Sequence, residues 1–327
     1  METRKIQRVG GGTYTVSIPI SWAEEHGVEA GETAYLYTHR DGSLIVRWGE
    51  REETALGGVD VEVGDAGTAV DRTLDAAYTA GFDRITFRGV SAAQREAITA
   101  RARTLVGVDV TEESEDAVEV RWLLDDSDLT VRRSVGQLRF VAVSMHDAAM
   151  GTLAGATAEP RSIGDRTQET DRLARLVERQ CSRAMVLFAA LDRLDATRPQ
   201  LFAQYRAARE LERVGTDAAE IAHAARRSGP VESTDLAADV RAVGDDAREA
   251  VEMAADAVVD GGSTATAYEV LRRADGAAQA ARELRRTVAA EAPSDGILLT
   301  RALDSVVRTT SRAETLGEIA LQRAVRS

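Results

Sequence analysis

From residue 131 to the end, the chain is a series of long helical segments rich in Ala, Arg, Glu and Asp, separated by short, well-marked breaks. Proline and glycine end helices, and they mark each break. The breaks are Glu159-Pro160, Arg198-Pro199, Gly229-Pro230, Gly261-Gly262-Ser263 and Ala292-Pro293-Ser294. They predict six helices, over residues 131–156, 163–196, 199–228, 233–259, 264–290 and 295–325. Helices of this length joined by such short turns must run antiparallel, as neighbours in a bundle.

The six predicted helices look like one three-helix unit repeated twice. Helices two and five share the pattern E-T-D-R-L-A-R-L around Asp171 and R-A-D-G-A-A-Q-A around Asp275. Helices three and six share A-E-I-A around Glu220 and G-E-I-A around Glu318. We therefore expect a mainly α protein with two stacked three-helix bundles, at residues 131–228 and 229–327.

The first 48 residues have a different, β-rich pattern, and we assign them to a separate module at residues 1–48. Arg4 to Pro19 reads R-K-I-Q-R-V-G-G-G-T-Y-T-V-S-I-P, an alternating stretch with three basic residues and three glycines. A short amphipathic segment follows at Ser21–His26. Asp41-Gly42 then predicts a tight turn between strands at Ala34–Thr38 and Ser43–Trp48.

Residues 49–130 alternate between strand and helix patterns, which favours a small two-layer α/β domain. Gly81 and Gly107 are expected to cap the C-terminal ends of the two helices. The predicted strands are Val59–Val63, Arg84–Phe87, Val108–Glu112 and Ala117–Leu124, and the predicted helices are Thr68–Ala80 and Ala92–Val106.

The chain is acidic overall, and the N-terminus is a local exception. It has 41 basic and 54 acidic residues, a net charge of −13. Lys5 is the only lysine. Scarce lysine with abundant carboxylates indicates adaptation to molar salt, where screening removes carboxylate repulsion; a GC-rich genome that favours arginine codons is the alternative. Residues 1–8 contain three basic residues, Arg4, Lys5 and Arg8, and one acidic residue, Glu2. The net charge of residues 1–48 is only −1.

Several patterns limit the class of protein. Cys181 is the only cysteine, which rules out an internal disulfide and predicts a small core residue. There is no N-terminal secretory pattern, and no apolar run approaches the roughly 20 residues that span a bilayer. We therefore expect a cytoplasmic protein without membrane insertion. The histidines do not cluster, and the phosphate-binding and catalytic motifs that would indicate an enzyme are missing from the sequence.

One helical segment carries a family resemblance. Arg209 to Ala225, R-E-L-E-R-V-G-T-D-A-A-E-I-A-H-A-A, resembles the signature helix of the PhoU family of phosphate-uptake regulators, L-E-R-I-G-D-H-A-x-N-I-A-E. The preceding helix, with Asp171-Arg172-Leu173 and Arg179-Gln180, is similar to that of archaeal members. The resemblance covers residues 131–327 and extends to 59–124 through T-L-D-A-A-Y-T-A-G-F-D-R-I. The matching positions are Leu211, Glu212, Arg213, Val214, Gly215, Ala218, Ile221 and Ala222.

This resemblance implies a regulator rather than an enzyme, with paired three-helix bundles whose E/D-x-x-x-D motifs can hold metal ions. Carboxylates one turn apart share a helix face, and oxygen ligands suit Mg²⁺, Mn²⁺ or iron. The sequence departs from the family pattern, because Thr216 stands where an aspartate is expected. The alternative is that these charges are simply solvated. The candidate metal ligands on the bundle surface are Asp171, Glu212, Asp217, Glu220, Asp275, Glu314 and Glu318.

The N-terminal module resembles the AbrB/MazE/SpoVT family of swapped-hairpin DNA-binding domains. The resemblance is carried by Arg8–Pro19, Trp22, Gly27-Val28, Gly31 and Leu44–Arg47. It implies that two copies interleave their strands, because about 48 residues bury too little surface alone. The implied DNA contacts are Arg4, Lys5, Arg8, Thr13 and Tyr14, with Arg40 and Arg47 as further candidates for which solvation at a strand edge is the alternative.

Together these patterns predict a dimeric, phosphate-responsive transcriptional regulator. The N-terminal module would bind operator DNA, and the PhoU-like bundles would receive the signal. The alternative is an adaptor that contacts a phosphate transporter ATPase or a sensor kinase and uses the module only to dimerise. A metal-dependent hydrolase is the least supported reading, because the acidic motifs are degraded.

Overall fold

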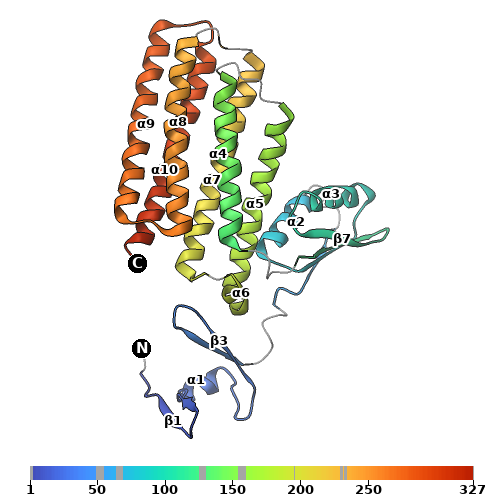
Figure 1. The fold of residues 1–327 in the computed structure, drawn as a ribbon. Coiled ribbons are helices and arrows are strands. Elements are labelled where there is room, and N and C mark those ends of the chain that lie inside the picture. The colour runs from blue at the N-terminus through green and yellow to red at the C-terminus, as the bar shows by residue number, and fades with distance from the viewer. Residues whose placement is uncertain are drawn as a thin grey trace.

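The computed structural model describes residues 3–48, 55–63, 69–124, 130–153, 160–194, 196–228, 231 and 234–326. A long helical body lies beside a small α/β domain, and the N-terminal β module lies at one end of the body (Figure 1). The predicted breaks at Glu159 and Gly229-Pro230 fall outside the described residues.

The helical body has six long helices as predicted, and five of them lie within a few residues of the predicted bounds. Pro199 and Gly261 mark two of the boundaries as expected, and Gly261 has a φ of 89°. The helices are α4 (Val131–Leu153), α5 (Pro160–Val186), α7 (Arg198–Ser228), α8 (Thr234–Asp256), α9 (Thr264–Glu291) and α10 (Gly296–Ala324), and α8 runs into a π-helical turn, η3 (Ala257–Gly261).

The second predicted helix, 163–196, is wrong at its C-terminal end. Helix α5 ends at Val186, Leu187 is extended with φ −107° and ψ 109°, and a separate short helix, α6 (Phe188–Arg193), follows. No proline or glycine marks this break. Leu187 is buried together with Leu56 and Ala190, so tertiary packing rather than local chemistry places the break.

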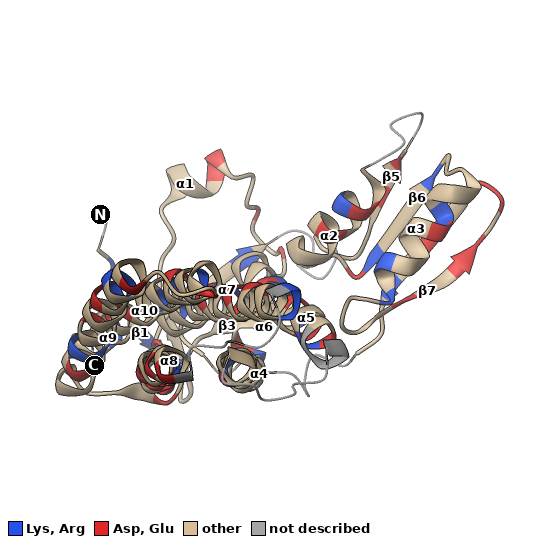
Figure 2. Ribbon diagram, turned by 90° about the horizontal axis from the view of Figure 1, so that it is seen from above, with Lys and Arg blue, Asp and Glu red and all other residues tan. Residues whose placement is uncertain are grey.

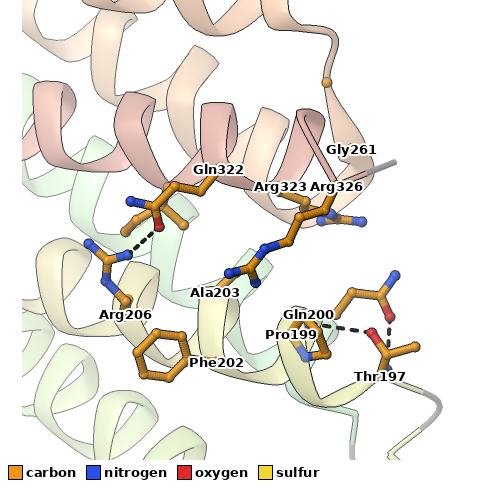
Figure 3. A pocket seen from close by; sticks show the side chains of 12 residues that line it. Thr197, Pro199, Gln200, Phe202, Ala203, Arg206, Gly261, Gln322, Arg323 and Arg326 are labelled. Atoms are coloured by element: carbon orange, nitrogen blue, oxygen red, sulfur yellow. Dashed lines mark hydrogen bonds between the residues drawn. The ribbon is translucent and has the colours of Figure 1, made fainter. Parts of the chain in front are cut away.

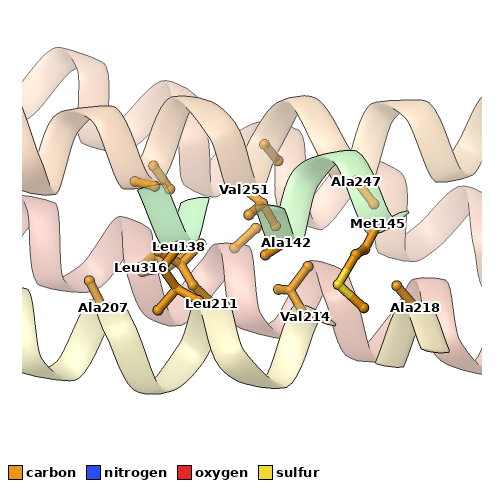
Figure 4. Close-up of a cluster of buried hydrophobic side chains, with 14 of the residues drawn as sticks. Leu138, Ala142, Met145, Ala207, Leu211, Val214, Ala218, Ala247, Val251 and Leu316 are labelled. Carbon is orange, nitrogen blue, oxygen red and sulfur yellow. The ribbon is translucent and has the colours of Figure 1, made fainter. Parts of the chain in front are cut away.

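The helical body consists of two three-helix bundles that share one apolar core. Helices α4, α5 and α7 pack together, as do α8, α9 and α10, and α7 packs on α10 while α4 packs on α8. Figure 4 shows this shared core, where α4 contributes Leu138 and Met145, α7 contributes Leu211, α8 contributes Val251 and α10 contributes Leu316. The fold is therefore mainly α with paired bundles, as predicted, and the exact domain limits at 48, 130 and 228 stay predictions.

The α/β domain has the predicted two layers. Its four-stranded sheet has the order β5-β6-β8-β7, with β5 and β6 parallel and the other pairs antiparallel. One sheet face packs on both helices through Ile85, Phe87, Val118 and Val120, and Figure 2 shows the helices over the strands. The elements are β5 (Val59–Glu62), α2 (Val70–Ala80), β6 (Arg84–Arg88), α3 (Ala92–Ala102), β7 (Val108–Glu113) and β8 (Ala117–Trp122).

The two predicted glycine caps have different outcomes. Gly81 caps α2 with a φ of 103°, which confirms the prediction. Gly107 does not cap α3, because that helix ends at Ala102. The turn closes instead through backbone bonds from Thr104 to Arg101 and from Leu105 to Ala102. Gly107 lies just before β7 with a φ of 75°.

Arginines of α5 hold the α/β domain on the helical body. Arg179 is 1% exposed, and its guanidinium carbon lies over the rings of Tyr78 and Trp122, at 5.2 and 4.4 Å from their centres. Its guanidinium donates to the carbonyls of Tyr78 and Phe82 and to Asp83, over 2.9–3.1 Å. Arg183 donates to the Gly81 carbonyl and to Asp83 as well, at 2.6 Å each. These carbonyls end α2, where a cation is favourable.

Candidate nucleic-acid interface

The N-terminal module consists of two separate hairpins joined by a short helix. Strands β1 (Gln7–Val9) and β2 (Thr13–Thr15) form one, α1 (Ile20–Glu25) follows, and β3 (Ala34–Thr38) and β4 (Leu44–Trp48) form the other. The Gly10–Gly12 turn closes the first hairpin, with Gly10 at a φ of 63° that suits glycine. The predicted turn at Asp41-Gly42 closes the second, with Gly42 at a φ of 80°.

The first hairpin places two predicted DNA contacts side by side. Arg8 and Tyr14 are cross-strand partners, so their side chains leave the same face of the hairpin. Arg8 also donates to the Gly11 carbonyl at 3.2 Å, which aligns its guanidinium along the turn. Thr13 pairs with Val9 on the opposite face, and Arg4 and Lys5 precede β1.

All seven predicted DNA-contact residues are exposed, but they do not form one group. Arg4, Lys5, Arg8, Thr13 and Tyr14 belong to the first hairpin and the residues leading into it. Arg47 lies on β4, opposite Tyr35, and Arg40 lies in the turn of the second hairpin. The second hairpin does not pair with the first, so the structure separates Arg40 and Arg47 from the other five.

Apolar side chains of the module are left uncovered within one chain. Helix α1 has no buried residue, and strands β1 and β2 are exposed along their whole length. Trp22 contacts the Trp48 ring at 4.5 Å and stacks on His26 at 4.4 Å, which joins α1 to β4. The exposed apolar residues are Ile6, Val9, Tyr14, Val16, Ile18, Ile20, Leu36 and Leu44.

The tip of the second hairpin docks on α6 of the helical body. His39 is 8% exposed, and its Nδ1 lies 2.7 Å from Asp192 Oδ1. The ring of Phe188 lies 5.8 Å from the Tyr37 ring and 6.1 Å from the His39 ring. The module is therefore attached to the bundle by a polar pair with an aromatic cluster beside it.

A second ion pair extends this contact to the first turn of α7. Arg198 Nη1 lies 2.9 Å from Asp41 Oδ2. Asp41 also accepts from the Ser43 hydroxyl at 2.6 Å and from the Ser43 backbone N–H at 2.9 Å. The Ser43 hydrogen bonds hold the pKa of Asp41 below its usual value, with Arg198 adding to the effect. Asp41 thus both stabilises the turn and ties it to the bundle.

Helix α6 contacts the α/β domain side as well. Leu56, Leu187 and Ala190 form a small buried cluster, and Phe82 packs against it. Leu56 precedes β5, and its carbonyl accepts from the Asp83 N–H at 2.8 Å. Helix α6 is therefore the junction of all three parts of the chain. No local pattern in the sequence indicates this role, because the predicted helix 163–196 makes the α6 residues a continuation of α5.

Two of the predicted metal ligands, Asp171 and Glu212, are each paired with an arginine. Asp171 is 3.0 Å from Arg175, and Glu212 is 2.8 Å from Arg209. Burial raises the pKa of Glu212, the positive charge of Arg209 opposes that shift, and the negative charge of Asp171 adds to it.

The remaining predicted metal ligands are either paired with arginine or exposed. Arg308 bridges Asp217 at 2.6 Å and Glu220 at 2.7 Å. Asp275, Glu314 and Glu318 are exposed on α9 and α10. Figure 2 shows acidic and basic residues interspersed along the bundle helices. Across the described residues, no group of three or more His, Cys, Asp or Glu side chains has the geometry to hold a metal ion.

Comparisons with known proteins find a family match near the N-terminus and a similar solved structure. Residues 7–50 match the family described as antidote-toxin recognition MazE, bacterial antitoxin. The crystal structure of PhoU from Pseudomonas aeruginosa is similar with a TM-score of 0.52 and 17% identity, over 60% of this chain and 96% of that chain. A comparison with curated protein sequences gives no match.

These matches confirm the combination of an AbrB/MazE-type module with a PhoU-like helical fold. At 17% identity the second match establishes the fold alone. The matched share of the chain equals the helical body in size. Neither match is to an enzyme. In the part of the chain that the structure describes, no helix is both long and apolar enough to cross a membrane.

Proposed function

We propose that this protein is a phosphate-responsive transcriptional regulator. The N-terminal module binds DNA through the first hairpin, and the PhoU-like bundles receive the signal. The observation that carries the proposal is that the two hairpins of the module have different surroundings. The second hairpin is docked on the bundle through His39 and Asp192, while the first presents Arg8 and Tyr14 to solvent.

A second copy of the chain would complete the module. Ile6, Ile18 and Ile20 are 70%, 47% and 76% exposed, which is unusual for residues of a folded module. About 48 residues cannot enclose a core by themselves. Two modules that pair through these faces would bury them and set two copies of the Arg8 hairpin side by side, as a dimeric DNA reader requires.

The DNA contacts we propose are Arg4, Lys5, Arg8, Thr13 and Tyr14. Arginine and lysine contact phosphates and guanine edges, and the glycine turn lets the backbone approach the duplex closely. Arg40 is left out of this set, because its turn faces the bundle next to the Asp41–Arg198 pair.

The docked hairpin provides the connection between signal and DNA. A regulator needs two states that differ in affinity for its effector. The His39–Asp192 and Asp41–Arg198 pairs join the module to α6 and the first turn of α7, so a rearrangement of either helix would move the hairpin.

The experiment is genome-wide DNA occupancy of the tagged full-length protein in phosphate-rich and phosphate-starved cells. The test variant carries Arg4→Gln, Lys5→Gln and Arg8→Gln. A matched control carries Arg282→Gln, Arg286→Gln and Arg301→Gln, which removes the same charge from exposed positions on the bundle. We expect discrete peaks near phosphate-uptake genes that change with phosphate and that only the N-terminal variant abolishes.

Two outcomes would contradict the proposal in different ways. Absence of peaks under both conditions would refute DNA binding and favour an adaptor that uses the module only to dimerise. Peaks that do not change with phosphate would keep DNA binding and refute the proposed signal.

A further inference from the structure

A cavity of about 340 Å³ lies at the end of the helical body, between the two bundles. It is formed by the first turns of α7, the last turns of α10 and the turn between α8 and α9 (Figure 3). Thr197, Pro199 and Phe202 line one side, and Gly261 and Arg323 line another. No residue considered above as a DNA or metal ligand belongs to it.

The cavity is positively charged in a chain that is strongly acidic. Arg206, Arg323 and Arg326 line it, and none of its lining residues is Asp or Glu. Arg206 donates to Gln322 at 2.9 Å, and within the described residues neither Arg206 nor Arg326 has a carboxylate partner. The whole chain has 54 acidic residues against 41 basic ones, so a cavity lined by three arginines and by no Asp or Glu is a local exception.

Arg323 forms the fixed back of the cavity. Its guanidinium donates to the carbonyls of Val258 and Val259 in the π-helical turn. Burial lowers the pKa of Arg323, the positive charge of Arg132 lowers it further, and Asp260 opposes the effect. Asp260 is itself paired with Arg132 at 2.6 Å. A bound anion would therefore relieve an excess of positive charge at this place.

The opposite wall offers an aromatic face. The Phe202 side chain is 55% exposed, and the Arg206 guanidinium lies 5.8 Å from the centre of its ring. Pro199, Ala203 and Ile319 add apolar surface. Figure 3 shows Phe202 and Arg206 together on α7, with Arg326, just after the end of α10, reaching toward them.

We propose that this cavity binds a phosphorylated organic anion of the nucleotide class. Its phosphate would lie among Arg206, Arg323 and Arg326, whose planar guanidinium groups can bind phosphate oxygens in pairs. Its base would lie against Phe202, since ring stacking tolerates any base. A volume of about 340 Å³ is within the range of small-molecule sites and larger than inorganic phosphate needs.

Titration calorimetry of the full-length protein at low ionic strength tests this, with AMP, adenosine and inorganic phosphate as probes. We expect AMP to bind more tightly than either of the other two. Arg206→Gln with Arg326→Gln should weaken AMP binding by at least about tenfold per arginine. Phe202→Ala should bring AMP close to the affinity of inorganic phosphate. Arg301→Gln, an exposed change on α10, is the control and should bind as the unmodified protein does.

Circular dichroism and thermal melting of each variant separate a lost site from a lost fold. A folded protein that binds neither AMP nor inorganic phosphate would overturn the proposal. Equal affinity for AMP and inorganic phosphate would overturn the nucleotide class. Equal weakening by Arg301→Gln would show that overall charge, and not this cavity, binds the anion. Binding to the cavity does not depend on whether the N-terminal module binds DNA.

Discussion

Replacement of Arg179 by methionine should loosen the α/β domain from the helical body. Arg179 is 1% exposed, and its guanidinium joins two carbonyls at the end of α2 to the carboxylate of Asp83. Methionine fills much of the same volume, so the change removes charge and hydrogen bonds without opening a large cavity. Arg175→Met, on the same helix and at the same interface, is the control.

Arg179→Met should cost more stability than Arg175→Met. It leaves two carbonyls at the end of α2 without this donor, at a cost of about 1–3 kcal/mol, and it removes the contacts with the rings of Tyr78 and Trp122. Asp83 is 39% exposed and keeps Arg183 as its partner, so its carboxylate adds little to this cost. Arg175 is 25% exposed and pairs with Asp171 and Asp75 at 3.0 and 3.1 Å. A partly exposed pair of this kind contributes about 0–1 kcal/mol.

Amide hydrogen exchange measured by mass spectrometry reports this interface directly. Arg179→Met should raise exchange in α2 and α3, where Arg179 holds the helix end, and leave the core of α8–α10 unchanged. Unfolding in urea followed by circular dichroism gives the free energies. If Arg179→Met and Arg175→Met lose the same stability, or if exchange in α2 does not rise, the buried arginine does not hold this domain in place.

Three further predictions concern the core. A Cβ on Gly317 would lie 2.9 Å from Val270 Cγ1, so Gly317→Ala should lower the free energy of unfolding by about 1–3 kcal/mol. Gly276 has open space around it, so Gly276→Ala should raise the free energy of unfolding by about 0.5–1 kcal/mol. The reverse order of the two variants in urea unfolding would disprove the close helix contact at Gly317. Burial raises the pKa of Cys181 to about 12, so iodoacetamide at about pH 8 should leave the folded protein unmodified and label it once unfolded, as mass spectrometry can check. Burial also lowers the pKa of His146 below 6.5, although the hydrogen bond to the Gly244 carbonyl opposes this shift. As pH falls, the unfolded chain therefore takes up the proton at this histidine before the folded protein does. The stability that is present above pH 6.5 is lost as pH falls toward the pKa of the folded state. His146→Gln should flatten this decline in urea unfolding from neutral pH to about pH 5, and an unchanged slope would show that other groups cause it.

The parts of the fold that sequence could predict are those set by local chemistry. Proline and glycine favour helix boundaries, so Pro199 in the first turn of α7 and Gly261 at the end of η3 place two limits within a few residues of the predicted ones. Gly107 shows the limit of this reasoning. A glycine indicates a positive φ but not which element it follows, and here it precedes a strand rather than ending a helix.

The break at Leu187 could not be predicted, because nothing in the local sequence favours it. Leu187 is an ordinary helix former, and it is extended in the structure, where it is buried with Leu56, a residue far away in the chain. The hydrophobic periodicity of a segment indicates which of its faces is buried, and it carries no information on which distant residue covers that face.

The same break explains why the junction of the three parts was missed. His39 and Asp192 are 153 positions apart, and each alone looks like a solvated polar residue. They meet because α6 turns away from α5 and presents Asp192 and Phe188 to the hairpin. Arg198, which holds Asp41, lies between Thr197 and Pro199 of the arginine-lined cavity. A ligand that shifts the first turn of α7 would therefore move the guanidinium that anchors the hairpin, because the cavity and the contact with the N-terminal module share one short segment of backbone.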